Sequence, residues 1–208
     1  MRPISPAPNP ALIRQNIPVP LRCGDKRKLL IVEASISVLA TEGLQGFTFD
    51  AIGKRCAIGK SHVAYHFSSL PDLLRTSVAH AYTVGQKTVS DYIQREPDPG
   101  KQLQAYIYGT FHWIEIHPEH ACTAALLGYL ATLDATYRKT QTEIKEVGLQ
   151  RIKALLKASG AKGPLPGLAD SIQSLLMGKL LYFSVTKDKR FVRRVRSETW
   201  QAIQRLLP

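Results

Sequence analysis

The stretch that decides the fold runs from residue 48 to residue 67 and reads TFDAIGKRCAIGKSHVAYHF. It predicts one short helix from Thr48 to about Cys56, a turn over residues 57–59, and a second short helix from Lys60 to about Phe67. Gly53 and Cys56 are small enough to let the two helices approach closely. Two such short helices, packed at a steep angle, are typical of a helix-turn-helix.

The ends of these two helices carry suitable capping residues. Thr48 can cap the first helix, and its hydroxyl and the adjacent amides lie at a positive helix end that suits a phosphate. Asp50 in the first turn agrees with that polarity, and Gly59 can cap the second helix. Four apolar side chains supply a small core: Ile52, Ile58, Val63 and Phe67.

Helical periodicity extends on both sides of this motif. The first 24 residues contain six prolines and predict an extended or disordered tail, after which a helix runs from Asp25 to Thr41 and stops at Gly43. Downstream, a helix is expected from Pro71 to about Gln94. Further helices are expected near 103–114, 122–133, 144–155, 168–186 and 188–207. With no convincing strand or repeat, the prediction is an all-α fold of about nine helices.

Three segments follow from this pattern. Residues 1–24 form the proline-rich tail, residues 25–70 a three-helix segment that contains the helix-turn-helix, and residues 71–208 a longer helical segment. The expected functional partner of the middle segment is nucleic acid, because the chain carries a net charge of +12 and a pI near 9.8. The basic excess lies at the two ends of the chain.

The remaining composition favours a cytoplasmic protein. The three cysteines, Cys23, Cys56 and Cys122, are too few and scattered for a disulfide framework and contain no Cys-x-x-Cys pair. The start of the chain has no apolar core of a signal peptide, and no stretch has about 18 uncharged apolar residues, so no membrane partner is expected.

Over residues 26–74 a series of features follows without a gap: Ile31-Val32-Glu33-Ala34, Gly43, Thr48, Ile52, Cys56-Ala57-Ile58, Val63, Tyr65-His66-Phe67 and Leu73-Leu74. In their order and spacing these features resemble the TetR family of bacterial transcription regulators. The resemblance implies a dimeric regulator that binds operator DNA, usually as a repressor, with residues 25–70 as its DNA-binding domain and residues 71–208 as its helical ligand-binding and dimerisation domain. It departs from the family at Ala64, where a tyrosine is usual, and at Leu70, where a phosphate-binding lysine is usual.

Carried over onto matching positions, the resemblance implies that Thr48 contacts the DNA backbone. It also implies five groove-facing residues: Lys60, Ser61, His62, Tyr65 and His66. Lys60 is the candidate for a guanine edge, and His66 for a phosphate. Arg2, Arg14 and Arg22 of the tail are candidates to replace lost phosphate contacts.

An enzyme is not expected. Gly59-Lys60-Ser61 resembles the end of a phosphate-binding loop, but that motif needs glycine where Lys54 stands and a strand before it. A metal site is not expected either, because Pro118 interrupts the run of His112, His117, His120 and Cys122 and no acidic partner completes a ligand set. No cofactor is predicted.

Two interpretations of function remain open. A sensing regulator would be released from a palindromic operator by a small, largely apolar ligand, whereas a non-sensing architectural DNA-binding protein would need no cavity. The candidate pocket residues are Tyr106, His112, Trp113, Leu126, Tyr129 and Met177. A homodimer is expected because the helix near 168–186 is apolar almost all round, with Leu181 and Trp200 as candidates to cross the interface.

Overall fold

The computed structural model describes residues 26–207, and in this part of the chain every regular element is a helix. In chain order the helices are α2 (Lys26–Gly46), α3 (Phe49–Arg55), α4 (Lys60–His66), α5 (Leu70–Arg95), α6 (Gln102–Ile116), α7 (Pro118–Leu133), α8 (Ala135–Ala158), α9 (Leu165–Thr186) and α10 (Lys189–Leu206). The all-α prediction is confirmed, and the predicted tail, with Arg2, Arg14 and Arg22, lies outside the described residues.

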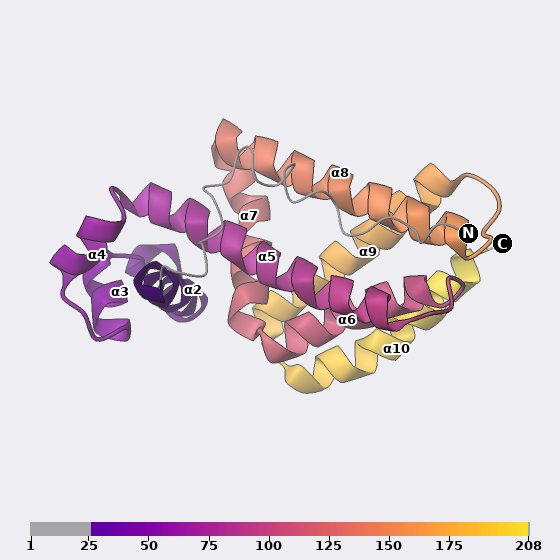
Figure 1. The fold of residues 1–208 in the computed structure, drawn as a ribbon, viewed down its shortest axis with the longest axis horizontal. Helices are drawn as coiled ribbons and strands as arrows, with labels where there is room; N and C mark the ends of the chain where they lie inside the picture. The colour runs from indigo at the N-terminus through magenta and orange to yellow at the C-terminus, as the bar shows by residue number, and fades with distance from the viewer. Residues whose placement is uncertain (1–25, 208) are drawn as a thin grey trace.

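The helices form a small head and a larger body (Figure 1). The head contains α2, α3 and α4, and the long helix α5 runs from it through the body. Within the body, α5 packs along α6, and α7 packs against α5, α8 and α9. Helix α10 packs against α6 and α9, at the side of the body away from α8.

Local sequence sets the helix ends. The hydroxyl of Thr48 accepts a hydrogen bond from the Ala51 amide at 3.1 Å, as expected for an N-cap. Ser69 and Asp134 cap α5 and α8 in the same way. Gly43 adopts a left-handed φ of 68° and breaks the helical path of α2, although the chain resumes a helical turn up to Gly46.

Helix α2 is long and apolar enough to cross a membrane when judged by length and composition alone, the only such helix among the described residues. Its apolar side chains are instead used in the head, where Ile31, Val32 and Ile36 are completely buried. Since α2 packs against α3, α5 and α7, it is a core helix of this fold.

The head and body share a continuous core. Residues of the head, such as Ile52 and Val63, belong to the same buried cluster as Phe111 and Leu127 of the body. A buried hydrogen bond from the Tyr82 hydroxyl to the Ala124 carbonyl, 3.2 Å long, ties α5 to α7. Movement of α5 against α7 therefore has to change packing near the head.

Candidate nucleic-acid interface

Helix α4 turns a polar face outward. Val63 is completely buried and points into the small core with Phe67 and Ile52. Around it, Lys60, Ser61, His62 and Tyr65 are exposed, and His66 is half-buried. Tyr65 is 84% exposed, and its ring meets that of His66 edge-on with centroids 5.3 Å apart. The Tyr65 ring and hydroxyl are therefore accessible to a partner at this face.

The turn before α4 depends on close backbone approach. A Cβ atom at Gly53 would lie 2.7 Å from the carbonyl oxygen of Ile58, so only glycine fits there. Ala57, in the turn itself, has a left-handed φ of 55°. Gly59 is the N-cap residue of α4 and has no side chain to cap the helix. The first amides of α4 are therefore available to an anion.

The basic side chains of the head differ in their partners. Arg55 donates to the Ser37 hydroxyl at 2.7 Å and to the Glu42 carboxylate at 3.0 Å, so it holds α3 against α2. Lys54 pairs with Asp50 at 2.7 Å, and this hydrogen bond lowers the pKa of Asp50. Among the described residues, Lys60 makes no such bond, and its ammonium group is available to an outside acceptor.

Helices α3 and α4 lie next to each other at the end of the head that is farthest from the body (Figure 1). A short exposed helix beside a capped helix end is the geometry by which proteins read base edges while binding the phosphate backbone. The arrangement found here contains the six predicted DNA-binding residues, five on α4 and Thr48 at the start of α3.

Comparison with known proteins agrees with this geometry. The family model for bacterial regulatory proteins of the tetR family matches residues 31–75. Residues 31–75 therefore carry a helix-turn-helix of the TetR type. The matched TetR segment runs from α2 into the first turns of α5, and it includes the complete helix-turn-helix.

Solved TetR-like structures show the same fold over nearly the whole chain. A TetR-like transcriptional regulator from Rhodococcus sp. RHA1 has a TM-score of 0.69 at 14% identity and covers 88% of this chain and 99% of its own. A TetR regulator from Legionella pneumophila has a TM-score of 0.67 at 19% identity, with 87% and 99% covered. FadR from Bacillus subtilis, solved in complex with stearoyl-CoA, has a TM-score of 0.67 at 12% identity, with 85% and 97% covered. No curated protein matches the chain by sequence.

The predicted pocket residues do not share one environment. Trp113 is buried and packs against Gly85, where an added Cβ would lie 2.9 Å from the indole ring. Tyr129 is 57% exposed on α7 and faces away from the body core. The other four, Tyr106, His112, Leu126 and Met177, are half-buried. Two open hollows, of about 320 and 390 Å³, lie elsewhere on the described surface, one between α5 and α6 and the other between α9 and α10.

Arg151 is a candidate ligand-binding residue that the sequence pattern did not reveal. It lies on α8, where one nitrogen of its guanidinium group donates to the Gln86 side chain at 2.6 Å. Its other terminal nitrogen is buried and has no hydrogen-bond partner among the described residues. Burial lowers the pKa of Arg151 and raises the pKa of the neighbouring Tyr106. A partly buried cation without a carboxylate partner is suited to a ligand that carries negative charge.

Proposed function

We propose that this regulator is a transcriptional repressor that binds a palindromic operator as a homodimer and is released by a small, largely apolar effector. The observation that carries the proposal is the exposed polar face of α4 around the buried Val63. One such helix reads only a few base pairs, so a specific site needs two half-sites and two subunits. We expect it to act in the cytoplasm, where the DNA lies, and to have no enzymatic activity.

Selection of bound fragments from random DNA tests the operator. An inverted repeat is expected. On the selected site, Lys60→Ala should weaken binding by about 1 to 3 kcal/mol and relax the preference at one position of each half-site, because Lys60 is proposed to contact a base. Lys157→Ala removes an exposed lysine far from α4, at the end of α8, and serves as the control for loss of charge. Equal affinity for the selected site and scrambled DNA at physiological salt would contradict the proposal.

The proposed dimer interface is the uncovered side of α9 and α10. Leu176, Leu180 and Phe183 of α9 are buried within the chain. On the other side of the same helix, Leu181 is 58% exposed and Val185 is 78% exposed, with Tyr182 beside them. Trp200 of α10 is half-buried. A contiguous apolar surface of this kind favours association with a second copy.

We propose that the effector binds in the body and that the effector itself has an apolar part and an acidic group. Half-buried Tyr106 offers an apolar ring near Arg151, and the guanidinium group of Arg151 offers a positive charge. The similarity to FadR, which was solved with stearoyl-CoA, supports a ligand that combines both characters. The chain would then respond through α5, which connects the body to the head.

A thermal-shift screen of small carboxylates and their neutral amides tests this proposal. Acids should stabilise the protein and weaken operator binding, typically by a factor of about 5 to 150. Arg151→Gln should abolish the advantage of the acid over its amide. If no compound stabilises the protein or changes operator affinity, the non-sensing architectural alternative is favoured.

A further inference from the structure

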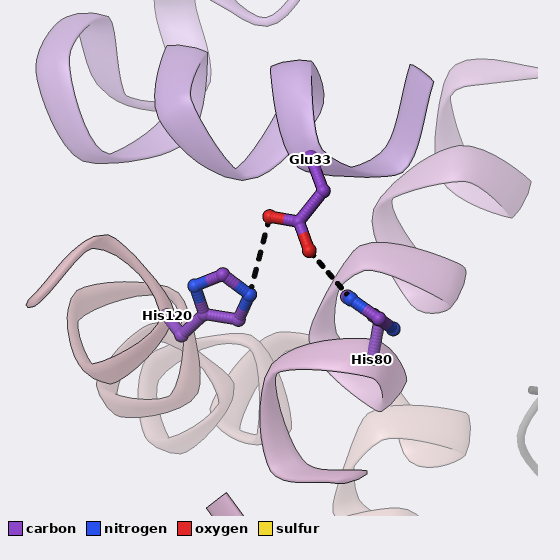
Figure 2. A group of neighbouring side chains, drawn as sticks. All are labelled: Glu33, His80 and His120. Atoms are coloured by element: carbon purple, nitrogen blue, oxygen red, sulfur yellow. Dashed lines mark hydrogen bonds and ion pairs between the residues drawn. The ribbon is translucent and has the colours of Figure 1, made fainter. Parts of the chain in front are cut away.

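Three ionisable side chains from three helices converge where the head meets the body (Figure 2). Glu33 comes from α2, His80 from α5 and His120 from α7. One carboxylate oxygen of Glu33 lies 2.8 Å from His80 Nε2, and the other lies 3.3 Å from His120 Nε2. One atom from each of the three side chains lies within 4.8 Å of the others.

This cluster is shielded from solvent on the body side. The side chain of His120 is 9% exposed and that of His80 is 17% exposed. The two imidazole rings have centroids 5.7 Å apart, and a third ring, that of His117, lies 5.1 Å from His120. His120 Nε2 is buried without a hydrogen bond of good geometry, although it points at the Glu33 carboxylate. A buried polar atom of this kind needs a partner.

We propose that Glu33, His80 and His120 bind a divalent transition-metal ion, with Zn²⁺ as the simplest case. Two imidazole nitrogens and one carboxylate are donors that Zn²⁺ and its first-row neighbours accept. With metal–ligand distances of about 2.0 to 2.2 Å, tetrahedral ligands lie roughly 3.3 Å apart. The two nitrogen–oxygen distances found here, 2.8 and 3.3 Å, need only small side-chain rotations to reach that geometry. His117 or a water molecule would complete the coordination.

The site would join the DNA-binding head to the body. Glu33 is the only ligand from the head, whereas His80 and His120 belong to helices of the body. A bound ion would therefore restrict movement of α2 relative to α5 and α7. This consequence rests on the proposed operator binding, because a restricted head changes how two recognition helices are presented to the two half-sites.

Titration of the full chain with Zn²⁺, followed by calorimetry, tests the site. One ion per chain is expected. Glu33→Gln and His120→Asn should each weaken binding at least tenfold, because each removes a ligand. Glu119→Gln is the matched control. Glu119 also connects α7 with α2, since its carboxylate accepts a hydrogen bond from Ser37 at 3.3 Å, but it lies outside the cluster and the variant should retain binding.

Co²⁺ provides a second measurement on the unmodified protein, which does not depend on how the variants fold. A visible spectrum typical of nitrogen and oxygen ligands supports the site, whereas thiolate charge-transfer bands would place the ion on cysteine and overturn it. Failure of the wild-type chain to bind Zn²⁺ would also overturn it, as would equal binding by the Glu33 and His120 variants. In that last case the cluster is a hydrogen-bonded group without a metal.

Operator binding measured with and without Zn²⁺ tests the coupling of head and body separately from the metal site. Wild-type affinity should change at least fivefold on addition of Zn²⁺, and Glu33→Gln should show no change. If Zn²⁺ binds at the cluster but operator affinity stays constant, the coupling of head and body is overturned while the metal site stands. If no specific operator exists, the proposed function fails, but the calorimetric result is unaffected.

Discussion

At the scale of single residues, Gly53 controls whether the helix-turn-helix forms. Its Cα hydrogen faces the Ile58 carbonyl, and an added Cβ would lie 2.7 Å from that backbone oxygen and 3.3 Å from the Lys60 nitrogen. Neither atom belongs to a flexible side chain. We expect Gly53→Ala to lower the free energy of unfolding by about 1 to 3 kcal/mol and to weaken DNA binding, because α4 has to move away from α3.

Gly59 in the same motif is the matched control. A Cβ there would meet the Ser61 Oγ atom at 3.6 Å, an ordinary contact, and serine is a good N-cap. Gly59→Ser should therefore keep the stability of the wild-type protein in urea unfolding. If Gly53→Ala were as stable as Gly59→Ser, that result would contradict the close packing of α3 against α4 at Gly53.

At the scale of elements, the contact between α5 and α6 depends on Gly109. A Cβ at this position would lie 2.9 Å from the Tyr92 Cβ and 3.1 Å from the Val89 Cα. Gly109→Ala should separate the two helices and cost about 1 to 3 kcal/mol of stability, despite the better helix propensity of alanine. Thermal or urea unfolding measures this cost.

Gly128 of α7 supplies the comparison for that element. Nothing lies within 4 Å of a Cβ placed there, and the residue is exposed. Gly128→Ala should stabilise the protein by up to about 1 kcal/mol through helix propensity alone. A stabilising effect of both substitutions would mean that α5 and α6 do not pack as closely as the structure has them.

At the scale of the whole molecule, the uncovered apolar side of α9 predicts the oligomeric state. Val185→Asp or Leu181→Asp should convert the proposed dimer to a monomer in sedimentation experiments at micromolar concentration, because each places a charge in the interface. Leu133→Asp, at the far end of α7, changes an equally exposed leucine outside this surface and should leave the dimer intact. A wild-type monomer that does not associate on DNA would contradict the dimer.

The sequence by itself determined the helix-turn-helix and the all-α fold. These depend on local features such as the cap at Thr48, the small residue at position 53, and apolar spacing of about 3.6 residues. It also identified the outward face of α4, since burying Val63 places the residues around it in solvent. Such features involve residues within one or two helical turns of each other, so they can be predicted from the local sequence.

Only the tertiary structure decided which helix faces meet in the body. Helical spacing grouped Trp113 and Tyr129 as pocket candidates, but packing buried the first against Gly85 and left the second exposed. Within residues 26–207, it also left one terminal nitrogen of Arg151 buried without a hydrogen-bond partner. The acidic partner that the histidine run lacked is Glu33, which lies on α2, 47 residues before His80. Spacing places a residue on a face of its own helix, whereas the crossing of three helices, set by the shapes of their side chains, decides what that face contacts.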